Sequence, residues 1–493
     1  MLFNSTVYIF IFLPLVLLIY FSLNKLRYIQ LGKAWLVLAS LYFYGFWNPS
    51  YLILIIGSML LNFGIGNSLH KSKKKKKAKG LTRKTVLIIG IVFNLAILFY
   101  FKYSDFFIEN INVLIGSNFT LLNLLLPLAI SFFTFQQVAY LVDCYQEDTQ
   151  EYDFLSYCLF VSFFPQLIAG PIVHHKEMMP QFSLLKNGFV NYTNIAKGLF
   201  VFSIGLFKKV VIADTFAIWA NQGFNSQVGL SFFEAWGASL SYTFQLYYDF
   251  SGYSDMAIGV ALMFNIMLPV NFNSPYKAKN IQDFWRRWHM TLSRWLRDYL
   301  YIPLGGNKKG TSRTYINLMI TFILGGVWHG AGWTFILWGF LHGGALAAHR
   351  FWQGFGLKMP TLLAWMLTFV FVNFAWVFFR AADIPSAMNI IEGMLGFNGI
   401  QVNGDFYQFI HYFTGWLPSW QLVNGNKMVG SVKTLQFILL FGYIAFWARN
   451  TLELGLNKSK FTIKDSFIIS LSLILTVLLG IASTASEFLY FNF

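Results

Sequence analysis

The sequence predicts an all-α protein that crosses a membrane about 11 times, with further re-entrant and interfacial helices. Of its 493 residues, 56% are apolar and only 11% are charged, whereas soluble globular proteins carry about 25% charged residues. The mean hydropathy is +0.55, and apolar runs comparable to the ~20 residues of one membrane span recur along the chain. These observations exclude a soluble enzyme, a disordered scaffold and a secreted disulfide module, and predict one polytopic domain over 1–493.

The first apolar runs set the predicted orientation. The run from Phe3 to Phe21 has no basic leader and no small-residue cleavage site, so we expect a retained span rather than a signal peptide. Runs at about 34–46 and 51–69 then lead to a segment at 70–84 that holds nine of the 36 Lys and Arg residues. The positive-inside rule makes this a cytoplasmic loop beside anionic lipids. The net charge of +16 is therefore no sign of a nucleic-acid partner.

The remaining elements follow from ten further apolar runs, some too short to cross alone and some long enough to bend. They lie near 85–102, 120–142, 153–172, 195–220, 231–268, 313–328, 330–349, 361–379, 433–448 and 464–485. The Gly- and Asn-rich stretch at 382–432 is expected to be an external loop on the membrane surface. Cys144 and Cys158 lie in or beside apolar runs, where a small buried hydrophobe is their expected role.

The segment 280–333 carries most of the chemical information, and its first part predicts one amphipathic helix. Asn280 is a suitable N-cap, and an apolar stripe at helical spacing follows it. The stripe consists of Ile281, Phe284, Trp285, Trp288, Leu292, Trp295, Leu296 and Tyr299. Other faces carry Arg286, Arg287, Arg294 and Arg297. An interfacial helix with tryptophans at head-group level would explain this pattern, but not the presence of His289 inside the stripe. The functional interpretation gives the arginines a polyanionic cytoplasmic ligand and places His289 toward the reaction.

The second part of the segment places His329 between glycines in a long apolar run. Gly325, Gly326, Gly330 and Gly332 flank it, which predicts a broken helix or a close backbone approach. An ionisable residue at such a place is a candidate functional residue, although a histidine that only bonds a neighbouring helix is the alternative. That alternative is favoured for His342 and His349. No metal-binding spacing accompanies the histidines, and the adjacent His174 and His175 cannot share a helical face, so we expect no metal site.

Two carboxylates, Asp249 and Asp255, lie within an aromatic and apolar run. They either pair with buried cations such as Lys208, Lys209 or an arginine of the segment at 286–297, or relay protons, and pairing is the commoner arrangement. The same alternatives apply to Asp143.

Four motifs occur in order: YDFSGYSDMAIG at 248–259, FWRRWH at 284–289, RDYLYIPLGGN at 297–307 and GVWHG at 326–330. With them the chain resembles the membrane-bound O-acyltransferase superfamily over about residues 5–380. Within it the chain is most similar to the bacterial alginate O-acetyltransferase branch, rather than the D-alanyl teichoic acid branch. The resemblance implies a multi-pass protein of the bacterial cytoplasmic membrane, with catalytic His329 and a helper His289 lining a central tunnel.

The resemblance also implies a reaction, an acyl donor and a partner. A cytoplasmic thioester, acyl-CoA (most simply acetyl-CoA) or an acyl-carrier thioester, would donate its acyl group to a hydroxyl across the membrane for exopolysaccharide O-acetylation. A secreted or membrane-anchored acyltransferase would finish the transfer, and no bound cofactor is implied. Peptidoglycan O-acylation and teichoic acid D-alanylation are the alternative reactions. The candidate substrate-binding residues are Arg286, Arg287, Arg294, Arg297, Trp285, Trp288, Trp328, Asp249 and Asp255.

Histidine is a suitable base for such a reaction near neutral pH. No Ser-His-Asp or Cys-His signature is present, which favours direct transfer without a covalent enzyme intermediate. An ion-coupled transporter or proton channel is the competing class, in which Asp249, Asp255 and the histidines form a relay. A non-catalytic membrane scaffold is a third possibility, and it leaves both His289 and His329 unexplained.

Overall fold

The structure is a computed structural model that describes residues 1–74, 82–146, 153–403, 412, 421–423, 429, 431–456, 458, 462–482 and 488–489. Residues 75–81 of the basic segment at 70–84 and much of the stretch at 382–432 therefore lie outside the described residues. The regular secondary structure of the described residues is helical apart from two three-residue parallel strands, β1 (Gln401–Asn403) and β2 (Gln421–Val423). This confirms the predicted all-α class.

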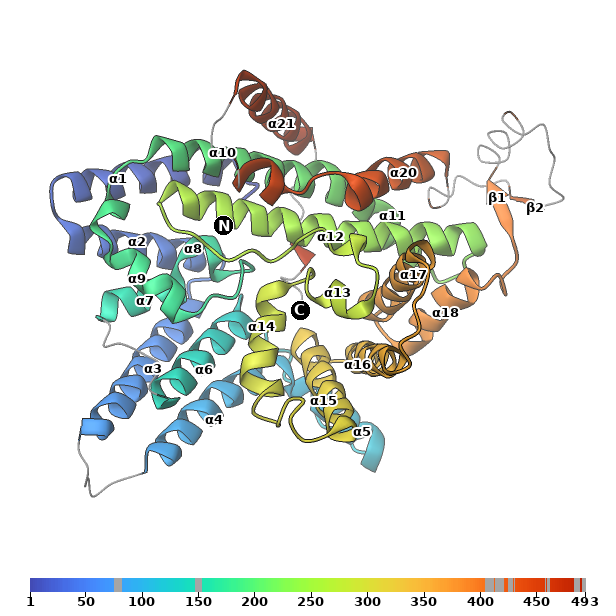
Figure 1. Ribbon diagram of the computed structural model, residues 1–493, viewed down its shortest axis with the longest axis horizontal. Coiled ribbons are helices and arrows are strands. Elements are labelled where there is room, and N and C mark those ends of the chain that lie inside the picture. The colour runs from blue at the N-terminus through green and yellow to red at the C-terminus, as the bar shows by residue number, and fades with distance from the viewer. Residues whose placement is uncertain are drawn as a thin grey trace.

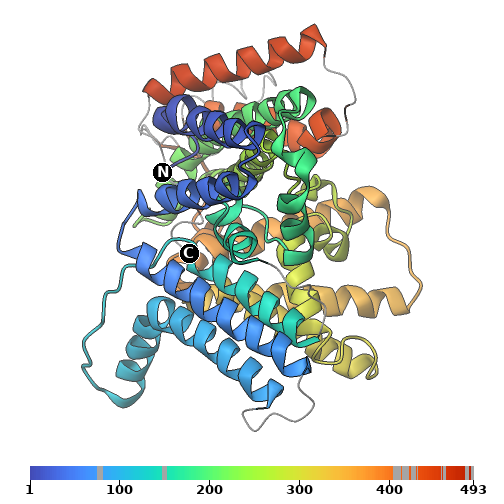
Figure 2. The same ribbon diagram turned by 90° about the vertical axis from the view of Figure 1, so that its left-hand side faces the viewer.

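The N-terminal part forms two groups of helices (Figure 1). The helices α3, α4 and α6 pack against one another, and α4 ends at Lys102, directly before the short helix α5. Figure 2 shows this group at the far end of the molecule from α21. The elements are η1 (Tyr8–Phe12), α1 (Leu13–Lys25), α2 (Ile29–Gly45), α3 (Tyr51–Lys74), α4 (Arg83–Lys102), α5 (Ser104–Ile115) and α6 (Ile130–Gln146).

A single helix of 32 residues, α12 (Phe232–Met263), lies at the centre of the fold. Ser231 and Glu234 form a capping box at its N-terminus, which satisfies the first free backbone N–H groups. The helix packs against α8, α10, α11, α17, α18 and α20 (Figure 1). The preceding elements are α7 (Phe154–Ser162), α8 (Phe164–Leu167), α9 (His175–Ser183), η2 (Leu185–Gly188), α10 (Tyr192–Phe207), η3 (Lys208–Ala213) and α11 (Asp214–Phe224).

The chain after α12 builds the region that contains His289 and His329. Its elements are η4 (Pro275–Lys277), α13 (Ile281–Trp285), α14 (Met290–Leu296), η5 (Arg297–Tyr301), α15 (Thr311–His329), α16 (Trp333–Gly354), α17 (Thr361–Arg380) and α18 (Ile384–Met394). Thus the stretch at 382–432 is not only loop, because α18 starts there with Asp383 as its N-cap. The C-terminal helices are α20 (Val432–Trp447), η6 (Leu452–Leu456) and α21 (Ile463–Ala482).

Within the described residues, four helical segments are long and apolar enough to cross a membrane by length and composition. They are Tyr8–Lys25, Tyr51–His70, Arg83–Lys102 and Thr361–Arg380. Several predicted runs become shorter helices instead: the run at 153–172 divides into α7 and α8, and helix α6 begins only at Ile130. The protein is an integral membrane protein whose interior includes helices too short or too polar to resemble isolated spans.

Candidate active site

His289 lies at a break between two short helices, which corrects the prediction of one continuous helix over this segment. Helix α13 ends at Trp285, α14 begins at Met290, and His289 between them has a left-handed backbone with φ +42°. A non-glycine residue in this conformation is strained and persists only where its surroundings hold it. The break therefore marks His289 as a residue whose position is imposed by its neighbours.

The neighbour that imposes it is the extended segment around Asn271. The backbone N–H of Met290 donates to the carbonyl of Asn271, and that of Asn273 donates to the carbonyl of Arg287, both at 2.9 Å. These bonds compete with the i→i−4 bonds that would continue the helix. Periodicity alone could not reveal them, because they join the helix to a segment outside it.

The side chain of Asn271 also orients the imidazole of His289. Its Oδ1 accepts hydrogen bonds from the backbone N–H and the hydroxyl of Thr291, at 3.3 and 2.8 Å, and lies 3.0 Å from Nδ1 of His289. Because this oxygen is an acceptor, Nδ1 of His289 carries the proton. The neutral ring then presents the lone pair of Nε2, which can accept a proton or a hydrogen bond.

His329 is the last residue of α15, as expected for a histidine between glycines. Gly330 and Gly332 have extended backbones, and α16 starts at Trp333. The two helices approach closely at Gly326 and Gly339, where an added Cβ would lie 2.2 and 2.3 Å from backbone oxygens. The predicted broken helix with close backbone approach is confirmed.

The two histidines lie side by side in an aromatic enclosure. Their ring centroids are 6.4 Å apart, and their exposed fractions are 0% for His289 and 3% for His329. Trp328 is 4.9 Å from the ring of His329 and 6.4 Å from that of His289. Trp338 and Phe379 each lie 5.1 Å from His329. Because both imidazoles are buried, they can accept and release protons without competition from bulk water.

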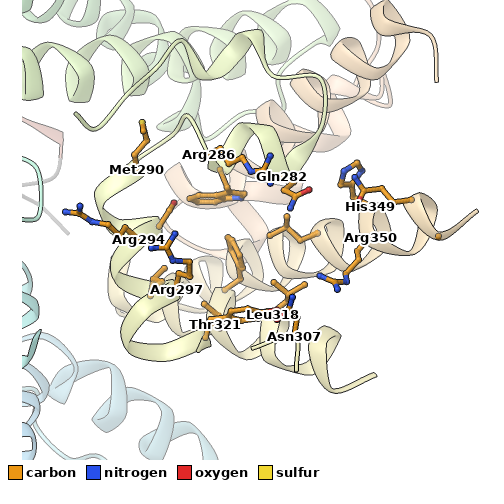
Figure 3. Close-up of a pocket in the computed structure, with 18 residues that line it drawn as sticks. Gln282, Arg286, Met290, Arg294, Arg297, Asn307, Leu318, Thr321, His349 and Arg350 are labelled. Atoms are coloured by element: carbon orange, nitrogen blue, oxygen red, sulfur yellow. The ribbon is translucent and has the colours of Figure 1, made fainter. Parts of the chain in front are cut away.

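A pocket of about 960 Å³ opens beside this enclosure, between α13–η5 and the helices α15 and α16 (Figure 3). Four arginines contribute to its lining: Arg286, Arg294, Arg297 and Arg350. Trp285 lines it too, and its indole N–H donates to Nδ1 of His342 at 3.2 Å. This bond gives His342 the structural role expected of it. The arginines give the pocket a positively charged lining.

The arginines of the pocket are not equivalent. Arg294 makes a bidentate pair with Glu177, at 2.6 and 3.0 Å, and Figure 3 shows its side chain directed away from the pocket centre. Arg297 pairs with the neighbouring Asp298 at 2.7 Å. In the described part of the chain, Arg286 and Arg350 make no ion pair with a carboxylate. They are therefore the pocket arginines most available to an anion.

Three other predicted ligand-binding residues do not line this pocket. Arg287 donates to Asp283 at 2.9 Å, one turn back along the chain. Trp288 is fully buried and packs 4.9 Å from the ring of Trp376. Trp328 stacks on Phe135 at 4.9 Å and helps to enclose the histidines. These side chains shape the site through packing or pairing.

The predicted carboxylates are held in ion pairs. Asp249 lies 2.8 Å from Nζ of Lys209, and Asp255 lies 2.6 Å from Nζ of Lys208. Asp249 also accepts a hydrogen bond from the backbone N–H of Leu489. Both pairs join α12 to the π-helical turn η3, so the expected pairing with buried lysines is confirmed, and neither carboxylate lines the arginine pocket.

Asp143 belongs to a separate polar cluster. It lies 3.3 Å from Nδ1 of His175 and accepts a hydrogen bond from the hydroxyl of Tyr299 at 2.9 Å. The Tyr299 hydroxyl is also 3.2 Å from Nδ1 of His174. The cluster ties α6 and α9 to the segment that carries the arginines.

A second pocket, of about 390 Å³, lies directly beyond His329. Gly330 and Ala331 line it together with Lys102, Asp105 and Arg380. Thus the residues that follow His329 in the chain line the smaller pocket. Trp285 and Met290, which lie before and after His289 in the chain, line the larger pocket. The tunnel implied by the resemblance would join the two cavities past the histidines, and it stays a prediction.

Three residues of the site were not predicted from the sequence: Asn271, Lys102 and Arg350. The sequence NFNSP at 271–275 holds a turn signal, with Pro275 after two asparagines, that could have marked a break near His289. Lys102 contacts the end of α15 from another helix, and Arg350 lines the pocket from α16; no local sequence pattern reveals either placement.

Comparison with known proteins indicates the family of this chain. A sequence model of the MBOAT, membrane-bound O-acyltransferase, family matches residues 144–384. The chain is 48% identical to the peptidoglycan O-acetyltransferase of Helicobacter pylori, over 100% of this chain and 98% of that protein. It is 41% identical to the “Probable alginate O-acetylase AlgI” of Pseudomonas aeruginosa, over 82% of this chain and 76% of that protein. The teichoic acid D-alanyltransferase of Bacillus subtilis is 31% identical to this chain, over 52% of this chain and 69% of that protein.

Proposed function

This chain belongs to the membrane-bound O-acyltransferase family and is an acyltransferase, and we propose that it moves an acetyl group across the bacterial cytoplasmic membrane. The donor is a cytoplasmic thioester, acetyl-CoA or an acetyl-carrier thioester, and the acceptor is a hydroxyl on the outer side. One observation carries the proposal: two buried histidines have ring centroids 6.4 Å apart, and residues close to them in the chain line an arginine-lined pocket and a second pocket. In this proposal about 11 membrane-spanning helices surround the site.

In the proposed reaction His329 acts as the general base. It removes the proton of the acceptor hydroxyl as the oxygen attacks the thioester carbonyl carbon, and the C–S bond then breaks as the thiolate leaves. The imidazolium returns the proton to the thiolate, so atoms and charge balance. His289 is held by Asn271 at 3.0 Å. Because its Nε2 presents a lone pair, its role in this reaction is to accept a hydrogen bond and orient the base. No acyl-enzyme intermediate is needed, because the thioester is already activated.

The donor is proposed to lie in the larger pocket. A volume of about 960 Å³ is within the range of sites that hold cofactor-sized ligands. Arg286 and Arg350 would bind the phosphates of the donor, since guanidinium groups bind phosphate oxygens in bidentate fashion. The thioester end would then extend past Trp285 toward the histidines.

We propose peptidoglycan as the acceptor, with an alginate-like exopolysaccharide as the second candidate. The named peptidoglycan O-acetyltransferase aligns with the entire chain, including the C-terminal helices, whereas the alginate O-acetylase aligns with 82% of it. The aligned C-terminal part includes the predicted external stretch at 382–432. A secreted or membrane-anchored acyltransferase that completes the transfer is the proposed partner at this face. D-alanylation of teichoic acid is less favoured because the match covers only 52% of the chain.

Deletion of the gene in the source bacterium tests both acceptors at once. Base-labile acetate is measured separately on purified peptidoglycan and on exopolysaccharide, with complementation by the native chain and by His329→Ala. Loss of acetate from peptidoglycan alone, restored only by the native chain, supports the proposal. Loss from exopolysaccharide alone would assign the second candidate, and unchanged acetate on both polymers would contradict both.

A further inference from the structure

The last carbonyl groups of α15 are bound by another helix. Carbonyls in the final turn of an α-helix lack partners within that helix. The hydroxyl of Tyr103 donates to the carbonyl of Val327 at 2.7 Å. Nζ of Lys102 donates to the carbonyls of Trp328 and His329, at 2.7 and 3.1 Å. Two consecutive residues at the end of α4 thus bind three consecutive carbonyls at the end of α15.

This contact is a helix C-cap supplied from outside the helix. A lysine side chain near the end of a helix can bind the last carbonyls, which have no partner within the helix. The ammonium group has a further contact with the hydroxyl of Ser131 at 3.3 Å, so three acceptors surround its three protons. Glycine at 330 and 332 gives the chain after His329 little stiffness of its own.

We propose that Lys102, assisted by Tyr103, is a positioning residue for the acyl transfer, which fixes the end of α15 and with it the imidazole of His329. The inference rests on the proposed role of His329 as the base. Without the cap the last turn of α15 would fray toward Gly330. The imidazole would then lose its setting against His289, and misplacement by about 1 Å can reduce turnover by about 100-fold.

Two other roles for Lys102 lead to different kinetics. Lys102 also lines the smaller pocket, so it could bind the acceptor, and its loss would then raise the acceptor KM. It could also serve folding alone, and its loss would then reduce the amount of folded enzyme but not the turnover of each folded molecule. A positioning residue lowers kcat per folded molecule and leaves the donor KM unchanged.

The experiment compares Lys102→Met, Lys102→Arg and Tyr103→Phe with a matched control, Lys277→Met. Nζ of Lys277 donates to the carbonyl of Ala448 at 2.7 Å, the C-cap residue of α20, so the control removes the same kind of bond elsewhere. Inverted membrane vesicles receive radiolabelled acetyl-CoA. Transfer to lumenal acceptor is measured per folded enzyme, quantified by size-exclusion chromatography in detergent. His329→Ala is included in the same assay.

We expect Lys102→Met to lower kcat by about 10- to 100-fold with an unchanged KM for acetyl-CoA. Lys102→Arg recovers most of this loss, because a guanidinium can donate to the same carbonyls. Tyr103→Phe lowers kcat by about 5-fold, as the loss of one neutral hydrogen bond would. The kcat of Lys277→Met stays within about 2-fold of the native value, since the helix end that Lys277 caps lies outside the site.

A native kcat per folded Lys102→Met molecule, with His329→Ala inactive, would overturn the positioning role and leave the proposed function standing. A raised KM for the acceptor at unchanged kcat would also overturn the positioning role. Full activity of His329→Ala would instead contradict the proposed function itself. If Lys102→Met does not fold, Tyr103→Phe decides, and a native kcat in that variant counts against the proposal.

Discussion

Asn271 determines which nitrogen of His289 carries the proton. Its Oδ1 accepts from the hydroxyl of Thr291 at 2.8 Å and faces Nδ1 of His289 at 3.0 Å, so the imidazole must donate there. The same asparagine breaks the helix on which His289 would otherwise lie, because its backbone carbonyl accepts from Met290. One residue thus sets the position, orientation and tautomer of the helper histidine.

Replacement of Asn271 by leucine should lower kcat by about 10- to 100-fold with little change in the KM for acetyl-CoA, because the ring of His289 loses its orienting partner. Asn271→Asp keeps the accepting oxygen and should remain closer to the native kcat. Steady-state kinetics in vesicles would measure both. Equal losses in the two variants would mean that the accepting side-chain oxygen is not what Asn271 contributes, and native kcat in both would mean that it acts through its backbone alone.

His329→Ala should abolish acetyl transfer, leaving at most about 0.1% of native turnover, because a general base contributes up to about 10⁴-fold. The protein should still insert and fold, since one imidazole contributes little to the packing of α15. Transfer is measured with radiolabelled acetyl-CoA, and folding by size-exclusion chromatography. His70→Ala, at the far end of α3, is the matched control. Substantial turnover by purified His329→Ala would refute the assignment.

The double variant Arg286→Gln/Arg350→Gln should raise the KM for acetyl-CoA by about 10-fold or more and make it less sensitive to salt, since two phosphate contacts are lost. The value of kcat should change less. Arg313→Gln, in the first turn of α15 and outside the pocket lining, is the control for removing a positive charge. An unchanged KM in the double variant would leave these arginines without a role in donor binding.

The two ends of α4 should face opposite sides of the membrane. Single cysteines at Lys75 and Asn118 are introduced into a chain in which Cys144 and Cys158 have been replaced. Lys75 lies outside the described residues, within the predicted cytoplasmic segment, and Asn118 is exposed beyond α5. An impermeant thiol reagent on intact cells should label position 118 only. Labelling at 75 alone would invert the orientation and the proposed direction of transfer.

Lys209→Met should destabilise the protein by about 3–5 kcal/mol, because it leaves the carboxylate of Asp249 buried without its cation. Lys209 lies 2.8 Å from Asp249 and 2.7 Å from Asp214, and its side chain is 5% exposed. Adding Asp249→Asn should restore much of the loss. Thermal unfolding in detergent measures both variants, and equal destabilisation of the single and double variants would contradict the pairing argument.

The local composition around His329 predicted the break of its helix correctly, because the glycines that allow the break are adjacent in sequence. The same reasoning failed at His289, where apolar spacing predicted a continuous helix. The break there comes from hydrogen bonds to Asn271, 18 residues away. Composition also predicted that Asp249 and Asp255 pair with buried cations, but it left an arginine of the segment at 286–297 open beside Lys208 and Lys209. It could not separate Arg286, which lines the pocket, from Arg287, which pairs with Asp283.

The contact between Lys102 and the end of α15 also has a consequence for biosynthesis. The two partners are separated by 226 residues, so Lys102 leaves the ribosome long before Trp328 exists. At ~5–20 residues per second the delay is about 10 to 45 s. During that time the ammonium group must remain at the membrane interface, where a long lysine side chain can extend to the head groups. The newly made protein can therefore become active only after α15 has been inserted beside α4.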